Sequence, residues 1–330
     1  MNQTRLYRLS AHFGSLRSTL ALLALLAAVV LLRPAWWPLG ALIALLAVNL
    51  LAALVVHPAF RRRLPLLVAH LALLALVLLV ALGRLLALDG RFELTQGVPF
   101  DGQLLDREAG ALHVDRLQRL AFMHDGFEID YAPGRKRGAT RNSVTWQGED
   151  GQPRSAVIGD HHPLVLQGHR FYTSPNKGFA PLLRWLPEKG DAVLGAVHLP
   201  SFPAQELRQS REWQLPDGRT AWVMLQTDQT LIDPASHTRF ALPREHRLVV
   251  RVGTRRAELA PGQHLALPGG TLVYEGLRTW MGYRVAYDPT LPWLLAAALL
   301  SALSLALHYA LKFRAESASA PAVWPGVAHG

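Results

Sequence analysis

Four long apolar runs stand out along the chain. They lie at residues 18–32, 39–56, 64–83 and 291–311. Each of the last three is long enough, as a helix that rises about 1.5 Å per residue, to cross roughly 30 Å of hydrocarbon. The first run is shorter, and it reaches this length if the Arg33 side chain extends toward water and Trp36 and Trp37 lie at the membrane interface. The pattern predicts four transmembrane helices, three near the N-terminus and one near the C-terminus.

The long segment between the third and fourth runs alternates between apolar and polar positions. Phe127, Ile129 and Tyr131 share one face of a predicted strand, and Glu128 and Asp130 share the other. Similar alternation recurs around residues 144–146, 248–252 and 272–274, with turn residues between these stretches. The predicted fold class is therefore an α plus β membrane protein, in which four transmembrane helices carry a mostly antiparallel β extracytoplasmic domain.

Basic residues flank the apolar runs and predict their orientation. They are Arg5, Arg8 and Arg17 before the first run, Arg61–Arg63 between the second and third, and Lys312 and Arg314 after the fourth. All of them fall on one side of the membrane if the N-terminus is cytoplasmic. The predicted parts are a cytoplasmic N-terminus (1–17), three transmembrane helices (18–83), a periplasmic β-rich domain (84–289), a fourth transmembrane helix (290–312) and a disordered cytoplasmic tail (313–330).

Composition excludes several classes of function. The net charge is +10, yet residues 84–288 hold 25 Lys/Arg against 23 Asp/Glu, so the basic excess lies beside the apolar runs. This distribution argues for membrane orientation and against nucleic-acid binding. The chain has no cysteine, which excludes a disulfide scaffold, a thiolate-ligated metal and a cysteine nucleophile. A cleaved signal peptide is the alternative for the first run, but no small-x-small site follows it.

Several motifs resemble those of one known family. They are Gly90–Gly97 (GRFELTQG), Phe127–Tyr131 with Gly134, Asp160–Leu164 (DHHPL) with Gly168 and Phe171–Ser174 (FYTS), and Gly282–Pro289 (GYRVAYDP). Their order, together with the layout of three spans, a large domain and a fourth span, is similar to the ResB family (CcsB-type) of system II cytochrome c biogenesis proteins. The family has Asn at the position of His161.

The resemblance implies a subunit of a cytochrome c synthase complex in the bacterial inner (cytoplasmic) membrane. Such a subunit helps to deliver haem b across the membrane for covalent attachment to apocytochrome c. It holds the haem transiently and shares it with a ResC/CcsA-like membrane subunit. A thioredoxin-like reductant keeps the apocytochrome thiols reduced in this system. The chain shows no evident catalytic acid, base or nucleophile, so we expect catalysis to belong to the complex.

His70 is the first candidate ligand of haem iron. It lies within an apolar stretch, seven residues after Arg63, where an imidazole is costly unless it has a ligand or a hydrogen-bond partner. Neutral imidazole is a good axial ligand of haem iron, and the resemblance implies that a histidine of the third span binds haem. The alternative is a hydrogen bond between helices, from the ring to a backbone carbonyl or to Ser/Thr.

His308, four residues before Lys312, is the second candidate. Because the third and fourth helices run in opposite directions, His70 and His308 fall in the same leaflet, and a bis-histidine site is possible if these helices pack. The alternatives are a second ligand from the partner subunit or an interfacial side chain without a haem role. The other histidines lack ligand-like spacing.

Two other functions remain open from the sequence. The first is a membrane-anchored periplasmic binding or scaffold protein with no haem role, in which His70 only packs between helices. The second is a sensor, which the small cytoplasmic parts disfavour because they leave no room for an output domain.

Overall fold

The structure is a computed structural model that describes residues 12–32 and 36–319, without the side chains of residues 36–38, 61, 318 and 319. It divides into two units. One unit is helical, and it comprises residues 1–87, 110–113 and 288–330; the other is built of strands, and it comprises residues 88–109 and 114–287. Arg5, Arg8, Arg33 and residues 320–330, on which part of the predicted topology depends, lie outside the described residues.

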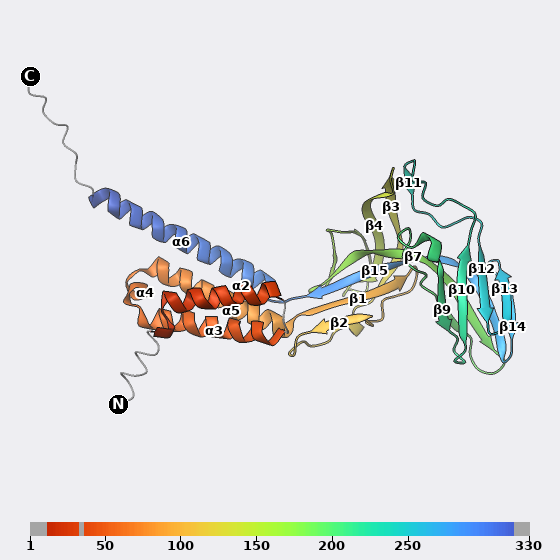
Figure 1. The fold of residues 1–330 in the computed structure, drawn as a ribbon, viewed down its shortest axis with the longest axis horizontal. Helices are drawn as coiled ribbons and strands as arrows, with labels where there is room; N and C mark the ends of the chain where they lie inside the picture. The colour runs from red at the N-terminus through yellow and green to blue at the C-terminus, as the bar shows by residue number, and fades with distance from the viewer. Residues whose placement is uncertain (1–11, 33–35, 320–330) are drawn as a thin grey trace, which may run out of the picture. The chain divides into compact units, whose positions relative to one another are not determined.

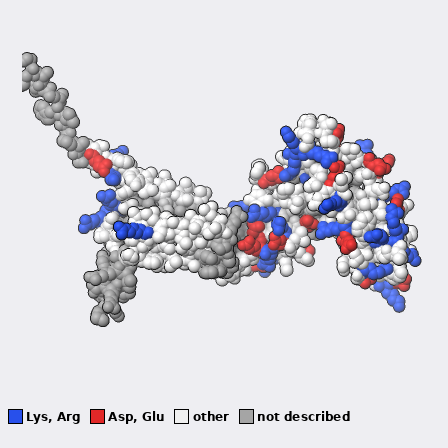
Figure 2. All heavy atoms as spheres, viewed as in Figure 1, with Lys and Arg blue, Asp and Glu red and all other residues white. Residues whose placement is uncertain are grey.

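The helical unit contains the four predicted apolar helices and one short connecting helix (Figure 1). The helices are α2 (Leu16–Leu32), α3 (Trp36–Val56), α4 (Pro58–Arg62), α5 (Leu64–Leu86) and α6 (Leu291–Ser319). Helices α3, α5 and α6 are long and apolar enough to cross a membrane, whereas α2 is a shorter apolar helix of 17 residues. The face drawn in Figure 2 shows uncharged helix sides, with Lys and Arg toward the ends. The chain is a multi-pass membrane protein.

Two helix ends differ from the predicted bounds. Helix α5 continues to Leu86, beyond the predicted end at residue 83. Helix α6 continues to Ser319, although the sequence predicts a disordered tail from residue 313. The extension is rich in good helix formers, and Lys312 and Glu316 lie 3.7 Å apart with the i,i+4 spacing that supports a helix.

Small and polar residues hold the helices together. Ala69 and Ala72 of α5 are 1% and 3% exposed, and the Ser301 hydroxyl of α6 donates to the Ala69 carbonyl at 3.3 Å. Between α2 and α3, the Thr19 hydroxyl donates to the buried Asn49 side chain at 2.8 Å. Such contacts replace the hydrophobic effect, which does not drive association between helices in lipid.

The β unit confirms the predicted antiparallel architecture. Its largest sheet has the order β2-β1-β15-β7-β6, with β14 paired to β15 and β8 to β7. These strands are β1 (Leu88–Thr95), β2 (Asp106–Ala109), β6 (Leu164–Leu166), β7 (His169–Pro187), β8 (Val193–Ala196), β14 (His264–Leu267) and β15 (Gly270–Tyr287). The long strands β7 and β15 form its centre (Figure 1).

Two four-stranded sheets complete this unit. The first has the order β13-β12-β10-β9, and its strands are β9 (Ser210–Gln214), β10 (Thr220–Gln226), β12 (Arg247–Val252) and β13 (Arg255–Leu259). The second has the order β11-β3-β4-β5, and its strands are β3 (Phe122–Ala132), β4 (Lys136–Gln147), β5 (Pro153–Ile158) and β11 (Thr238–Arg239).

Two apolar clusters form the core of the β unit. One includes Ile129, Leu183 and Val250, and the other includes Phe92, Phe171 and Tyr283. The alternation predicted for residues 127–131 and 248–252 places Ile129 and Val250 inward, because successive residues of a strand point to opposite faces. Val249 is also buried, on the other face of β12.

Candidate functional site

His70 lies on α5 with one ring nitrogen bonded to its own helix. Its Nδ1 is 2.8 Å from the Leu66 carbonyl, one turn earlier, so Nδ1 carries the proton and donates. The ring is half-buried, and its centroid lies 4.4 Å from that of Phe60 on α4. Within the described part of the chain, no side chain or carbonyl bonds to Nε2. With Nδ1 held in this bond, Nε2 is the ring nitrogen that remains to bind a metal.

The structure does not bring His308 to His70. Ser301 contacts Ala69, which places the level of His70 near the middle of α6, whereas His308 lies seven residues farther along, about 10 Å away at the rise of a helix. Helix α6 also diverges from the other helices toward its C-terminal end (Figure 1). The His308 ring contacts the neighbouring Tyr309 at 5.5 Å between centroids.

Other histidines of the sequence analysis have ordinary environments. His161 and His162 are both exposed. His57 Nε2 lies 3.1 Å from the Gly14 carbonyl. Among the described residues there is no group of three His, Asp or Glu side chains that could hold a metal ion.

The motifs that carry the family resemblance meet in the β unit, around a bulge in strand β7. Thr173 pairs with Tyr283 and Lys177 with Met281, so Ser174, Pro175 and Asn176 lie opposite the single residue Gly282. A Cβ atom on Gly282 would lie 2.5 Å from the Ser174 hydroxyl. The Asn176 carbonyl oxygen would lie 3.1 Å from the same atom, so the bulge leaves little room for a side chain at position 282. The bulge also turns the next side chain, Lys177, inward.

Lys177 is a buried cation that the sequence analysis missed. It is 3% exposed, its Nζ donates to the Pro175 carbonyl at 3.3 Å, and it lies 5.8 Å from the centroid of the Tyr131 ring. Burial lowers the pKa of Lys177 to about 8, with a smaller contribution from Arg137 that Asp160 opposes. The sequence gives no sign of this site, since an isolated lysine on a strand normally faces water.

The Tyr131 hydroxyl is buried and has no hydrogen-bond partner among the described residues. Burial raises the pKa of Tyr131 to about 12. Arg137 bonds to the Asp160 carboxylate and to the Thr140 hydroxyl, and Thr173 donates to the same carboxylate at 3.4 Å. Asp160 of the DHHPL motif thus connects strands β4 and β7.

A second polar cluster lies in the core between β3, β4 and β15. The Tyr283 hydroxyl donates to Asn142 Oδ1 at 2.6 Å, and Asn142 Nδ2 donates to His124 Nδ1 at 2.7 Å. His124 is fully buried, and burial lowers its pKa to about 4, so the ring is neutral at pH 7. Its Nε2 has no partner among the described residues. This cluster fixes the packing of the three strands.

Three side chains form a hydrogen-bonded row that resembles a catalytic triad. Thr95 Oγ1 lies 2.7 Å from His198 Nε2, and His198 Nδ1 lies 2.8 Å from Glu93 Oε2. Acyl transfer also requires free N–H groups to stabilise an oxyanion. The N–H groups of the three residues after Thr95 all donate to carbonyl oxygens, and Thr95 is 4% exposed. The row therefore connects β1 to the segment around His198.

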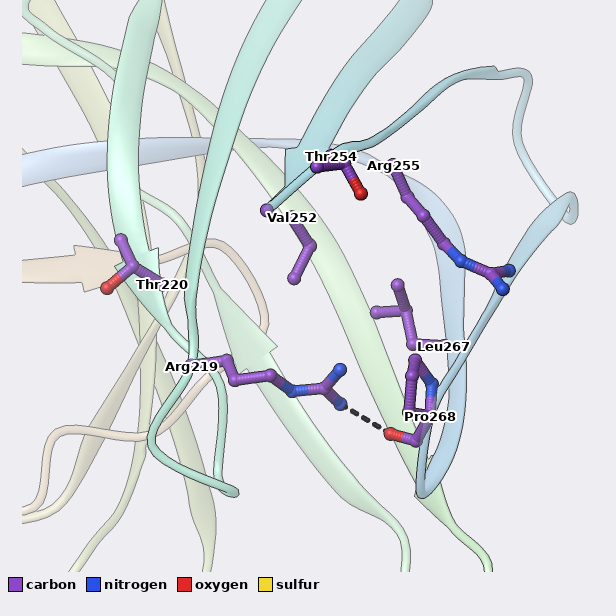
Figure 3. A pocket seen from close by; sticks show the side chains of 8 residues that line it. Arg219, Thr220, Val252, Thr254, Arg255, Leu267 and Pro268 are labelled. Carbon is purple, nitrogen blue, oxygen red and sulfur yellow. Dashed lines mark hydrogen bonds between the residues drawn. The ribbon is translucent and has the colours of Figure 1, made fainter.

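A shallow pocket of about 450 Å³ lies at the turn between β12 and β13 (Figure 3). Arg219 on its wall donates to the Pro268 carbonyl at 2.8 Å, pairs with Asp217 and lies 5.5 Å from the Trp185 ring centroid. Arg255 donates to the Ala266 carbonyl at 3.0 Å. Both guanidinium groups already have protein partners, and the lining residues include no His, Asp or Glu that could act as a base on the Thr220 or Thr254 hydroxyl.

Comparison with known proteins supports the resemblance that the motifs indicate. The model described as "ResB-like family" matches residues 59–207. This range includes helix α5 with His70, and it continues through β7 with Lys177. No curated protein matches the chain.

Proposed function

Because this chain belongs to the ResB-like family over residues 59–207, we propose that it is a membrane subunit of a system II cytochrome c synthase complex. Family membership connects the chain to cytochrome c biogenesis. In the proposed role it lies in the bacterial inner membrane with the β unit in the periplasm. It delivers haem together with a ResC/CcsA-like partner for attachment to apocytochrome c.

The geometry of His70 carries this proposal. An imidazole on an apolar helix has a bonded Nδ1 and an Nε2 without a partner among the described residues. Haem is the cargo here, and when bound it supplies the iron that His70 ligates and the vinyl groups that react with cysteine thiols. The chain itself orients the ring through Leu66 and packs Phe60 against it. The distance from His308 favours a second axial ligand from the partner.

Substitution of His70 tests this function. We expect protein with His70→Ala, purified with its partner subunit, to lose most of its Soret absorbance. The variant should also attach less haem to a reporter cytochrome c, and added imidazole should restore part of both signals because it can enter the vacated ligand position. His57→Ala, directly before α4, and His308→Ala, within α6, are matched controls, and both should retain haem.

A scaffold without a haem role is the second candidate, and the Nδ1 bond of His70 to its own helix is compatible with it. In that case wild-type protein shows no Soret absorbance, alone or with the partner. His70→Ala then matures cytochrome c normally at equal protein level. Either result would contradict the proposed haem role.

A further inference from the structure

A short loop of the chain returns to the helices from the β unit. Residues Gly110–His113 follow strand β2, yet they belong to the helical unit. The Leu112 N–H donates to the Leu85 carbonyl at 2.8 Å, and the Gly110 N–H donates to the Ala87 carbonyl at 2.9 Å. His113 Nδ1 lies 2.9 Å from the Leu86 carbonyl. The loop therefore covers the C-terminal end of α5.

These bonds satisfy carbonyl groups that a helix end leaves without partners. The last four carbonyls of an α-helix have no N–H donor within the helix. At a membrane boundary such groups are costly, since fewer waters are available to bond them. Protein donors from the loop remove this cost at Leu85 and Leu86.

Gly110 allows the loop to approach the helix closely. A Cβ atom at this position would lie 2.3 Å from the Leu85 carbonyl oxygen and 2.4 Å from that of Arg84. Both atoms belong to backbone and cannot move aside as a flexible side chain could. The close approach of the loop to α5 therefore depends on the absence of a side chain at Gly110.

The level of the loop coincides with the end of the apolar helices. Gly83 of α5 packs against Thr290, directly before α6 begins at Leu291. Trp293, in the first turn of α6, is 67% exposed, as is typical of aromatic side chains at a membrane interface. The Leu112 N–H bonds to Leu85, two residues beyond Gly83, which is about 3 Å farther along the helix.

The exposed side of the loop is apolar. Leu112 is 57% exposed, and Ala111 beside it is also exposed. Leu82 and Leu85 in the last turns of α5 are each 41% exposed, so the apolar surface of the loop continues that of the spanning helix. If the hydrocarbon of a bilayer covers Leu82 and Leu85, the headgroup layer beyond it is roughly 5–8 Å thick. Leu112 then lies at the level of this layer.

We propose that the loop Gly110–His113 binds the membrane, with Leu112 inserted at the boundary between lipid headgroups and acyl chains. The loop then anchors the helical unit to the lipid surface at the end of α5. This inference depends on the spanning helices and the loop contacts, and it does not depend on a haem role.

The absence of cysteine makes the test direct, because Leu112→Cys introduces the only thiol among the 330 residues of the chain. The protein is labelled with an environment-sensitive dye and reconstituted into vesicles of phosphatidylethanolamine and phosphatidylglycerol. We expect quenching by lipid that carries a nitroxide near the headgroup. Iodide, present on both faces, should quench the label at least about twofold less than the dye–cysteine adduct free in buffer.

Leu73→Cys provides the reference for the bilayer core, since Leu73 lies mid-way along α5 and is 41% exposed. Its label should respond to a nitroxide deep in the acyl chains more strongly than the Leu112 label does. The inference is overturned if iodide quenches the Leu112 label as strongly as the free adduct and headgroup nitroxides leave it unchanged. It is also overturned if Leu112 behaves like Leu73, because the loop would then lie in the core.

Discussion

The buried ammonium group of Lys177 makes the stability of the folded protein depend on pH. Its pKa is lowered from 10.5 to about 8, first by burial. Below pH 8 the lysine is charged in both states, and the buried charge destabilises the folded protein by a constant amount. Between about pH 8 and 10.5 the unfolded chain keeps a proton that the folded chain has lost, so stability rises with pH across this window.

We therefore expect Lys177→Met to stabilise the protein at pH 7, by at most about 3 kcal/mol. The variant should also lose the rise in stability between pH 8 and 10. Thermal unfolding of the detergent-solubilised chain at several pH values measures both effects. Lys189→Met is the matched control because Lys189 is exposed, and it should follow the wild type. A Lys177 variant that is less stable at pH 7 would show that the ammonium group stabilises the fold.

Asn142 connects two buried groups, and its loss should be costly. It accepts from Tyr283 and donates to His124, both in the core. We expect Asn142→Leu to lower the free energy of unfolding by about 2–4 kcal/mol, since it leaves two buried polar groups without partners. In the Tyr283→Phe background the same substitution should cost less, and the double-mutant cycle measures this coupling. Additive effects would mean that the two residues act independently.

At the scale of elements, helices and strands were largely predictable and their contacts were not. The apolar runs and the alternation at residues 127–131 specify α5, α6 and β3 locally. The inward position of Lys177 results from a bulge between β7 and β15, whose pairing joins residues about a hundred positions apart, and no local pattern encodes this register. By contrast, helix geometry alone predicts the bond from His70 Nδ1 to the Leu66 carbonyl, because the two residues are one turn apart.

The loop against α5 is an element whose position depends on one glycine. We expect Gly110→Ala to displace the loop and to free the Leu85 carbonyl, because the added methyl group would collide with backbone oxygens. The loss in stability should be about 1–3 kcal/mol. Hydrogen exchange of the Leu112 amide should become faster, while exchange in β12 stays unchanged. Gly262→Ala is a control, since it places a methyl group in open space at a positive φ of 84° and reports backbone strain alone.

At the scale of the whole molecule, charge distribution predicts which parts face which side of the membrane. Arg62 and Arg63 lie between α3 and α5, and Lys312 and Arg314 lie in the C-terminal part of α6, whereas the block from 84 to 288 is nearly neutral. We expect these cationic flanks to be cytoplasmic, because translocation of cationic segments across the membrane is disfavoured. If all four apolar helices span the membrane, we expect the segments that flank α2 and α6 to lie on that same side.

Single cysteines in the cysteine-free chain test this arrangement in intact bacterial cells. Thr254→Cys lies at an exposed turn of the β unit, and Ser317→Cys lies at an exposed position near the end of α6. A maleimide that cannot cross the inner membrane should label Thr254→Cys in intact cells and label Ser317→Cys after lysis alone. Labelling of both sites in intact cells would mean that one of the four apolar helices does not span. Helix α2 would then be the first candidate for the helix that does not span, because with 17 residues it is the shortest of the four.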